Sequence, residues 1–325
     1  MPSEKPGNKG IIRHPGPQDV PVLKALWRAS FPEDREGDFV PWYFARRYDP
    51  DCCWLLEEAG ELAAMCYAPP VQMQTAAGLV RVPYIQGVAT AAEKRRQGLC
   101  RRLLAHVEAE LAEGGAPFCV LKPFDPEFYR PLGYRFFSYL RRYNLSFADH
   151  FLQGLATADQ VIGGEWRLEH WLRPGLPQAA AAVAEVYQEW CRGLYAYALR
   201  DEQSCQMLLE DHQNDGGMLL LARDREGRPL AYALYTATGA GIFLRELAYT
   251  RRRAARALLL ALGADYREDT PEAVIIQPDD GRLAAILPQT LAGWQTLPFA
   301  MFKPLTQRPE ECYNAIRGGY FYEYM

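Results

Sequence analysis

The fold class of this chain is decided by residues 84–104, which read YIQGVATAAEKRRQGLCRRLL. The first part belongs to a predicted strand over 81–90, and the last part opens a predicted helix over 99–113 with apolar residues recurring on one face. Between them lies a polar, arginine-rich turn that ends at Gly98. A strand, a turn and an amphipathic helix in direct succession are typical of α/β and α+β domains.

The arginine-rich turn has the chemistry of an anion site. A helix begins with free backbone N–H groups, and the helix dipole places partial positive charge at the same point. Arg95 and Arg96 add full charges there, and Gly98 would let the backbone approach a pyrophosphate closely. The turn has neither the G-K-[ST] sequence of a Walker loop nor the G-x-G-x-x-G of a dinucleotide site. Taken alone, it also suits a solvated turn before an ordinary helix.

The surrounding elements predict a first domain over 1–148. Its predicted strands are 11–14, 52–57, 62–68, 81–90, 117–124 and 134–147, and its helices are 39–48, 99–113, 125–132 and one that opens at Asp19. The second half repeats the order of helices, hairpin, strand, arginine-rich helix start and strand, which predicts a second domain over 149–305. Residues 306–325 follow as a tail rich in Tyr and Phe.

Composition limits the partners and the compartment. With 23 % charged residues and a formal net charge of -4, the chain has no broad cationic surface for nucleic acid or anionic lipid. Its eight cysteines show no C-x-x-C spacing and no His at metal-ligand spacing, which argues against a zinc site or a disulfide framework. No signal peptide and no run of the roughly 18–20 apolar residues that a membrane helix needs is found. We therefore expect a cytoplasmic protein with no metal, no nucleic-acid partner and no membrane partner.

Two motifs resemble the GNAT superfamily of N-acetyltransferases. Its acetyl-CoA motif, [QR]-x-x-G-x-[GA], is similar to residues 95–100, RRQGLC, which follow the strand end VAT at 88–90. Cys100 stands where the motif has Gly or Ala, and its side chain is still small. Residues 128–134, FYRPLGY, are similar to the F-Y-x-x-x-G-[FY] signature of the same superfamily.

More narrowly, residues 11–305 resemble the enhanced-intracellular-survival (Eis-type) acetyltransferases. That resemblance implies tandem GNAT-like domains, each with a mixed, mostly antiparallel central sheet flanked by helices. This family usually ends with a sterol-carrier-like domain, which we expect to be missing here because only some 20 residues follow the repeat. The second domain is expected to be degenerate, because its turn at 249–257 has arginines without a following glycine. We expect it to shape the acceptor cleft and the surface of a homo-oligomer.

The resemblance also implies the function and the cofactor residues. It implies an acetyl-CoA-dependent N-acetyltransferase that moves an acetyl group directly to a primary amine of a small molecule or peptide, without a metal. Backbone groups of Val88 and Thr90 would bind the pantetheine arm. The pyrophosphate would be held by Arg95, Arg96, Gly98, Leu99 and Cys100.

Tyr129 would be the general acid that protonates the departing thiolate, although a tyrosine in so aromatic a region also suits the core. For the base, the resemblance implies the C-terminal carboxylate, here that of Met325, with Glu323 or water as alternatives and a merely packed tail as another. A cationic amine needs carboxylates and aromatic faces, which Glu33, Asp34 and Trp42 offer, although the two acids also suit a loop or helix cap.

Two other functions stay open at this point. A Fem-type aminoacyl transferase also joins two GNAT-like halves, but it must bind transfer RNA, and the chain has no basic face for it. A non-catalytic acyl-CoA sensor or interaction protein would keep the cofactor turn without turnover. Replacing Tyr129 with Phe would separate this sensor from an enzyme.

Overall fold

The computed structural model describes residues 10–148, 152–154, 156, 166–173, 175, 177–239, 241–266, 272–278, 281–287, 294–321 and 323. These residues form two compact units, which we describe separately. Unit 1 comprises the described residues of Met1–Phe137, Ala300–Arg317 and Glu323–Met325, and unit 2 those of Ser138–Phe299 and Gly318–Tyr322. Unit 1 thus takes in late parts of the chain, which the predicted domain boundaries did not include.

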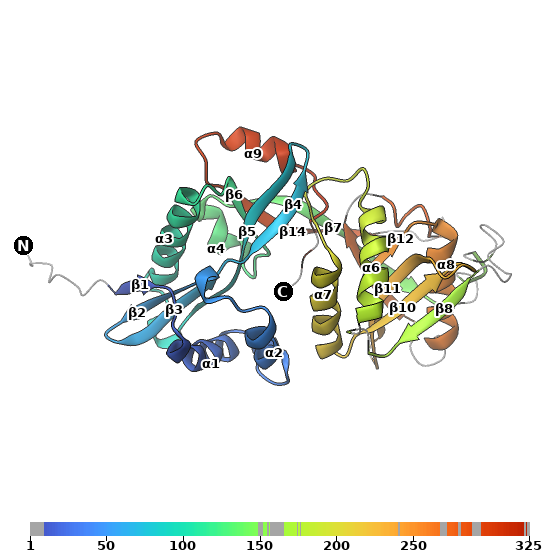
Figure 1. Ribbon diagram of the computed structural model, residues 1–325, viewed down its shortest axis with the longest axis horizontal. Helices are drawn as coiled ribbons and strands as arrows, with labels where there is room; N and C mark the ends of the chain where they lie inside the picture. Colours follow the sequence, from blue (N-terminus) through green and yellow to red (C-terminus); the bar gives the residue numbers. More distant parts are fainter. Residues whose placement is uncertain are drawn as a thin grey trace, which may run out of the picture. The chain divides into compact units, whose positions relative to one another are not determined.

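A mixed sheet forms the centre of unit 1 (Figure 1). Its strands in spatial order are β1 (Ile11–Arg13), β2 (Cys53–Glu58), β3 (Glu61–Tyr67), β5 (Gly78–Thr90), β6 (Phe118–Leu121) and the end of β14 (Gln295–Pro304). The described pairs are antiparallel except between β5 and β6, which run parallel. The first half of β5 also forms a hairpin with β4 (Pro70–Thr75).

Helices cover both faces of this sheet. On one face lies α3 (Leu99–Glu113), and on the other lie α1 (Val20–Ser30) and α2 (Phe39–Arg46). The strands alternate between these two cores, because successive side chains of a strand point to opposite faces. Leu56, Cys66 and Ile85 pack in the α3 core, whereas Cys53, Met65 and Ala89 pack in the core of α1 and α2.

Unit 2 repeats the plan of unit 1. Its sheet has the order β7 (Arg135–Ser146), β13 (Glu272–Pro278), β12 (Gly241–Tyr249), β11 (Pro229–Thr238), β10 (Met218–Arg223) and β8 (Arg167–Trp171). Only the β12–β13 pair is parallel among the described pairs of this sheet. The helices are α6 (Pro177–Trp190), α7 (Glu202–Asn214) and α8 (Arg252–Tyr266). The predicted fold class, with helices flanking a mostly antiparallel sheet in each half, is confirmed.

Most elements predicted from the sequence are present, and several shorter ones were missed. The helix over 99–113 has the predicted bounds, and the turn between β2 and β3 has φ of 55° at Ala59 and 81° at Gly60. The missed elements include β4, the two-residue strand β9 (Tyr197–Ala198) and the helix α9 (Pro309–Ile316), which lies inside the predicted tail. Among the helices of the described residues, none has the length and apolar character needed to cross a bilayer.

Candidate active site

The strands β5 and β6 part at the centre of unit 1. They pair at Tyr84↔Val120 and Ile85↔Leu121, where β6 ends, while β5 continues to Thr90. The end of β5 keeps its partner on the opposite edge, since Ala89 and Thr90 pair with β3. Beyond Ile85, the edge of β5 that faces β6 therefore has no strand partner in the described register. Val88 and Thr90 both lie in this open segment and are half-buried.

A bulge shapes the open segment. The register between β3 and β5 shifts between the pairs Met65↔Ala89 and Tyr67↔Gln86, so Gly87 and Val88 stand outside the ladder. Gly87 has φ of +58°, and a Cβ built on it would lie 2.8 Å from the Trp27 ring. The bulge therefore requires glycine both for its backbone conformation and for the close approach of Trp27.

The cofactor turn, residues 91–98, connects β5 to α3. Two residues in it have left-handed backbone, Arg96 with φ of +63° and Gly98 with φ of +80°. Gly98 is the N-cap of α3 and makes no side-chain cap hydrogen bond, and nothing lies within 4 Å of the position its Cβ would take. Arg95 folds back, and its Nε donates to the carbonyl of Thr90 at 3.1 Å. A helix start with left-handed residues and open space before it can receive an anion.

Leu99 and Cys100 begin α3 with different environments. Leu99 is buried in the α3 core, and Cys100 is half-buried. Burial raises the pKa of the Cys100 thiol to about 11, so it stays neutral and poorly nucleophilic at neutral pH. Arg95, Arg96 and Gly98 are exposed, which leaves the turn accessible to a ligand.

Tyr129 ends the short helix α4 (Pro126–Tyr129), which follows β6. Asp125 caps this helix by accepting the Glu127 N–H at 3.0 Å. The ring of Tyr129 is 9 % exposed and packs edge-on against Phe128 and Tyr134, with centroid distances of 5.0 and 5.5 Å. Burial is the main cause that raises the pKa of Tyr129 above its usual value.

Two features fit Tyr129 for proton donation. No described residue forms a hydrogen bond with its hydroxyl, and the thiols of Cys66 and Cys100 are among the groups that interact with it electrostatically. The phenol is protonated at neutral pH with or without this shift, so its hydroxyl has a proton to donate.

The three predicted acceptor residues have separate surroundings. Glu33 is exposed in the turn Pro32–Asp34. Asp34 accepts the Trp27 indole N–H at 2.8 Å and so holds that ring. Trp42 is half-buried, and the Arg47 guanidinium lies 5.9 Å from its ring centroid. One of the two carboxylates and the aromatic face therefore already have partners within unit 1.

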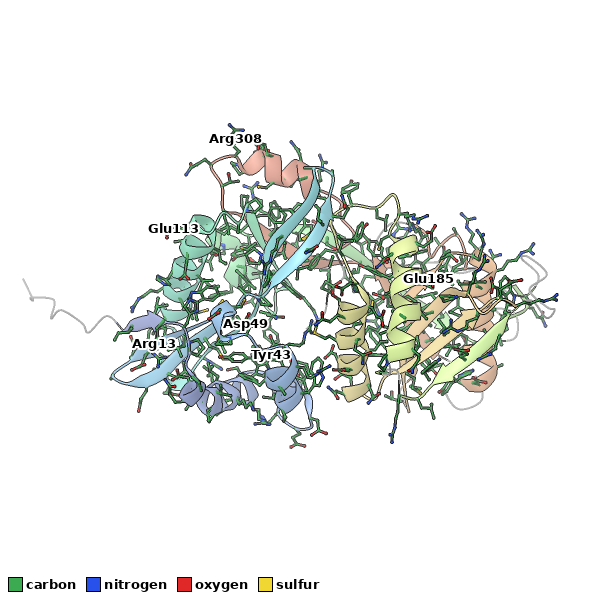
Figure 2. All side chains as sticks on the ribbon, in the orientation of Figure 1. Arg13, Tyr43, Asp49, Glu113, Glu185 and Arg308 are labelled. Carbon is green, nitrogen blue, oxygen red and sulfur yellow. The ribbon has the colours of Figure 1, made fainter. Side chains whose placement is uncertain are left out.

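A cluster of rings between α1, α2 and the sheet was missed by sequence reasoning. Its central member Tyr43, labelled in Figure 2, packs against Trp27 at 4.7 Å and Tyr67 at 5.8 Å between centroids. Gln86 of β5 donates its amide to the Tyr43 hydroxyl at 2.9 Å, and both side chains are buried. A cavity of about 10 Å³, room for about one water molecule, lies among these rings beside Gly87. The spacing of the aromatic residues along α2 was the sequence feature that could have indicated this cluster.

The end of the chain returns to β5. The Tyr84 hydroxyl donates to the main-chain carbonyl of Glu323 at 3.0 Å, and both residues belong to unit 1. Met325 lies outside the described residues, so the structure says nothing of its carboxylate. The strand itself carries no acid, since β5 reads GLVRVPYIQGVAT.

Unit 2 has a pair of parallel strands that corresponds to β5 and β6, but the side chains near it make different contacts. β12 pairs with β13 from Ile242 to Leu244 and runs on to Tyr249, just as β5 outruns β6. Here the Tyr249 hydroxyl donates to the carbonyl of Arg282 at 2.9 Å, and Arg256 Nε of α8 donates to the carbonyl of Ile286 at 2.9 Å. Side chains thus tie the segment that follows β13 to the end of β12 and to α8. Across the described part of both units, no group of acidic, His or Cys residues is arranged to hold a metal ion.

Comparison with solved structures shows the same fold in several proteins. A protein from Enterococcus faecalis described as a "Probable N-Acyltransferase" superimposes with a TM-score of 0.76 at 17 % identity, over 91 % of this chain and 73 % of that chain. A GCN5-related N-acetyltransferase from Anabaena variabilis gives 0.72 at 17 %, over 91 % and 73 %. Eis1 from Mycobacterium abscessus gives 0.66 at 13 %, over 91 % and 74 %. At these identities the likeness shows the fold.

Sequence comparison supplies the family of the first half. Residues 12–137 match the family described as "Acetyltransferase (GNAT) domain", which confirms the GNAT resemblance of the two motifs. Comparison with curated protein sequences finds no match. The family match covers the parted strands, the cofactor turn and Tyr129. It identifies residues 12–137 as a GNAT acetyltransferase domain, which supports an acyltransferase enzyme.

Proposed function

We propose that this chain transfers an acetyl group from acetyl-CoA directly to a primary amine of a small molecule or peptide, as an Eis-type N-acetyltransferase. The observation that carries the proposal is the open edge of β5 beside the uncapped start of α3. Such an edge binds an extended, amide-bearing arm as an added strand would, and the helix start binds phosphates. These are the two parts of coenzyme A that precede the thioester.

The residues of the first domain would divide the cofactor between them. Backbone groups of Val88 and Thr90 would bind the pantetheine arm along the open edge. The N–H groups that follow Gly98, at Leu99 and Cys100, would bind the pyrophosphate, and the open space at Gly98 supports this assignment. Arg95 and Arg96 are exposed beside this space and would add charge.

Tyr129 would act as the general acid. When bound, acetyl-CoA supplies the acetyl thioester, whose carbon–sulfur bond breaks as the new carbon–nitrogen bond forms. The hydroxyl of Tyr129 would give its proton to the departing sulfur, which leaves as the free thiol. The Tyr129 hydroxyl forms no hydrogen bond with a described residue and carries a proton at neutral pH, which supports this role.

The amine must give up a proton before it attacks, because a primary amine is cationic at neutral pH. Since β5 carries no acid, the base has to come from another segment. We retain the carboxylate of Met325 as the base and Glu323 as the alternative, because the contact between Tyr84 and Glu323 brings this segment to β5. Adding residues after Met325 would abolish transfer if its carboxylate is the base, whereas Glu323→Gln would do so if Glu323 is.

For the acceptor we propose the side of unit 1 that carries α1 and α2. Of the two predicted acids Glu33 is exposed, as are Glu36 and Asp38 in the same loop, whereas Asp34 orients Trp27 and Trp42 has a cation near its ring. Glu33 would then attract the cationic amine, with Asp34 and Trp42 forming part of the wall. The second domain would contribute to the acceptor cleft and to a homo-oligomer surface instead of binding coenzyme A.

Calorimetry with acetyl-CoA tests the cofactor site. Gly98→Glu should abolish micromolar binding, because the new carboxylate would occupy the space proposed for the phosphates. Gly193→Glu in unit 2 is the matched control: Gly193 has φ of +78° and equally open surroundings, so it carries the same backbone strain far along the chain. Absence of binding by the unchanged protein, or equal binding by both variants, would contradict the proposal.

Transfer itself is measured as release of free thiol with a panel of amines. The panel consists of a polyamine, an aminoglycoside and a peptide with a free N-terminus. Thiol release that depends on one class of amine supports the enzyme and identifies that class. Binding of acetyl-CoA without thiol release from any of them would favour a sensor.

A further inference from the structure

A buried polar network lies directly behind Tyr129. We define the Glu108 network as Glu108 of α3, Tyr134, Lys303 of β14 and Cys119 of β6. The Tyr134 hydroxyl donates to Glu108 Oε1 at 2.7 Å, and Lys303 Nζ donates to Glu108 Oε2. Cys119 Sγ lies 3.4 Å from the Tyr134 hydroxyl. All four residues belong to unit 1.

The network holds the Tyr134 ring from several sides. Tyr134 is 1 % exposed, and the Lys303 ammonium lies 5.6 Å from its ring centroid. Gly133, with φ of +95°, turns the chain inward just before Tyr134, and its missing Cβ would lie 3.6 Å from Lys303 Cε. A carboxylate as buried as Glu108 is costly unless it is paired, so Glu108, Lys303 and Tyr134 constrain one another.

Tyr129 depends on this ring for its own position. Its hydroxyl has no hydrogen-bond partner among the described residues, so packing alone orients its ring. One of the two rings that pack on it is Tyr134, at an interplanar angle of 75°. The other is Phe128, which is its neighbour in α4 and moves with the same helix. Tyr129 also packs in the α3 core, and of these two rings Tyr134 is the one that connects it to Glu108 of α3 and Cys119 of β6.

We propose that Tyr134, Glu108 and Lys303 are positioning residues, which set the Tyr129 hydroxyl at the place where the leaving sulfur takes up its proton. This inference rests on the acid role of Tyr129 in the proposed function. It adds that the placement of the Tyr129 hydroxyl depends on β14, a strand late in the chain whose Lys303 pairs with Cys119 of β6.

Unit 2 offers a matched control with the same chemistry. There the hydroxyl of Tyr232 donates to the buried Glu246, and Arg200 binds the same carboxylate at 2.9 Å. Tyr232→Phe and Tyr134→Phe both keep a ring and remove a buried hydrogen bond between Tyr and Glu. We expect both variants to lower the melting temperature, by about 2–6 °C. Only Tyr134→Phe should slow the reaction.

The test compares kcat in four variants, with Glu108→Gln as a fifth in reserve. Tyr134→Phe should lower kcat by about tenfold with KM for acetyl-CoA within about twofold, because a small displacement of the acid slows the chemistry and not the binding. Tyr232→Phe should leave kcat unchanged. Adding Tyr134→Phe to Tyr129→Phe should cost nothing further in kcat, since the network would act only through Tyr129. Should Tyr134→Phe fail to fold, Glu108→Gln should give a smaller loss of about threefold, because its amide oxygen still accepts from Tyr134.

Each contrary result has a distinct meaning. A wild-type kcat in Tyr134→Phe, or the same tenfold loss in the Tyr129→Phe background, would overturn the positioning role and leave the proposed function standing. A loss of kcat in Tyr232→Phe as large as in Tyr134→Phe would overturn it as well, because the effect would then follow stability. If Tyr129→Phe has the wild-type kcat, the acid role fails, and the positioning role fails with it.

Discussion

Replacing Gly87 with Ala should destabilise unit 1 by about 2–5 kcal/mol. The left-handed conformation at φ of +58° costs an L-residue about 1–2 kcal/mol. The new Cβ would lie 2.8 Å from Trp27 Cζ3, and that ring is held by the hydrogen bond from its indole N–H to Asp34. Overpacking of this kind adds about 1–3 kcal/mol. Gly98→Ala, with φ of +80° and nothing within 4 Å of its Cβ, should show only the backbone cost.

Urea unfolding followed by tryptophan fluorescence measures both losses. Because the chain has two compact units, the comparison uses the transition that moves in both variants. Gly87→Ala should shift that midpoint clearly more than Gly98→Ala does. Equal shifts would refute the clash with Trp27 as a separate cost, and a larger shift in Gly98→Ala would refute the assignment of open space to that turn.

Three further changes have definite expected outcomes. Tyr129→Phe should lower kcat by about 100-fold and keep acetyl-CoA binding. Because burial raises the pKa of Tyr129, the acid should stay protonated up to about pH 10. A fall of kcat below pH 9 that disappears in the variant would contradict this. Burial and Arg245 lower the pKa of His212 from 6.5 to about 4, so the unfolded chain binds the proton first. The stability from His212 is complete above pH 6.5 and falls by about 3 kcal/mol towards pH 4. Acid unfolding should be less pH-dependent in His212→Gln, and identical curves would exclude the role. Glu33→Gln should raise KM for a cationic amine severalfold at constant kcat, and an unchanged KM would remove Glu33 from the acceptor site.

Local signals made the cofactor turn and α3 predictable. The helix over 99–113 has a regular apolar face and a glycine at each end, so its bounds follow from near neighbours in the sequence. The left-handed φ of Gly98 could be predicted in the same way, because glycine adopts this backbone conformation without strain. The open edge of β5, by contrast, depends on where the pairing with β6 stops, and no residue in either strand marks that point.

Long-range contacts account for what the sequence did not reveal. Lys303 meets Glu108 across 195 residues of chain, because β14 returns to pair with β6. Tyr43 and Gln86 meet between a helix and a strand whose relative placement no local pattern specifies. The helix α9 also depends on contacts with distant segments, since Ala315 accepts from the Ala76 N–H and Cys312 donates to the Pro117 carbonyl. A lysine or a tail helix carries no sign of such partners in its own neighbourhood.

The comparison between the two units indicates what makes one pair of parted strands a site. In both units the long strand outruns its parallel neighbour and a helix follows. In unit 1 the helix start is left open at Gly98, whereas in unit 2 Arg256 and Tyr249 bind carbonyls of the segment after β13. Arg256 is thus bound inside unit 2, while Arg251, Arg252 and Arg253 of the same turn stay exposed but are followed by no glycine. Strand architecture alone therefore does not make an acyl-CoA site, and this supports the proposal that only the first domain binds the cofactor.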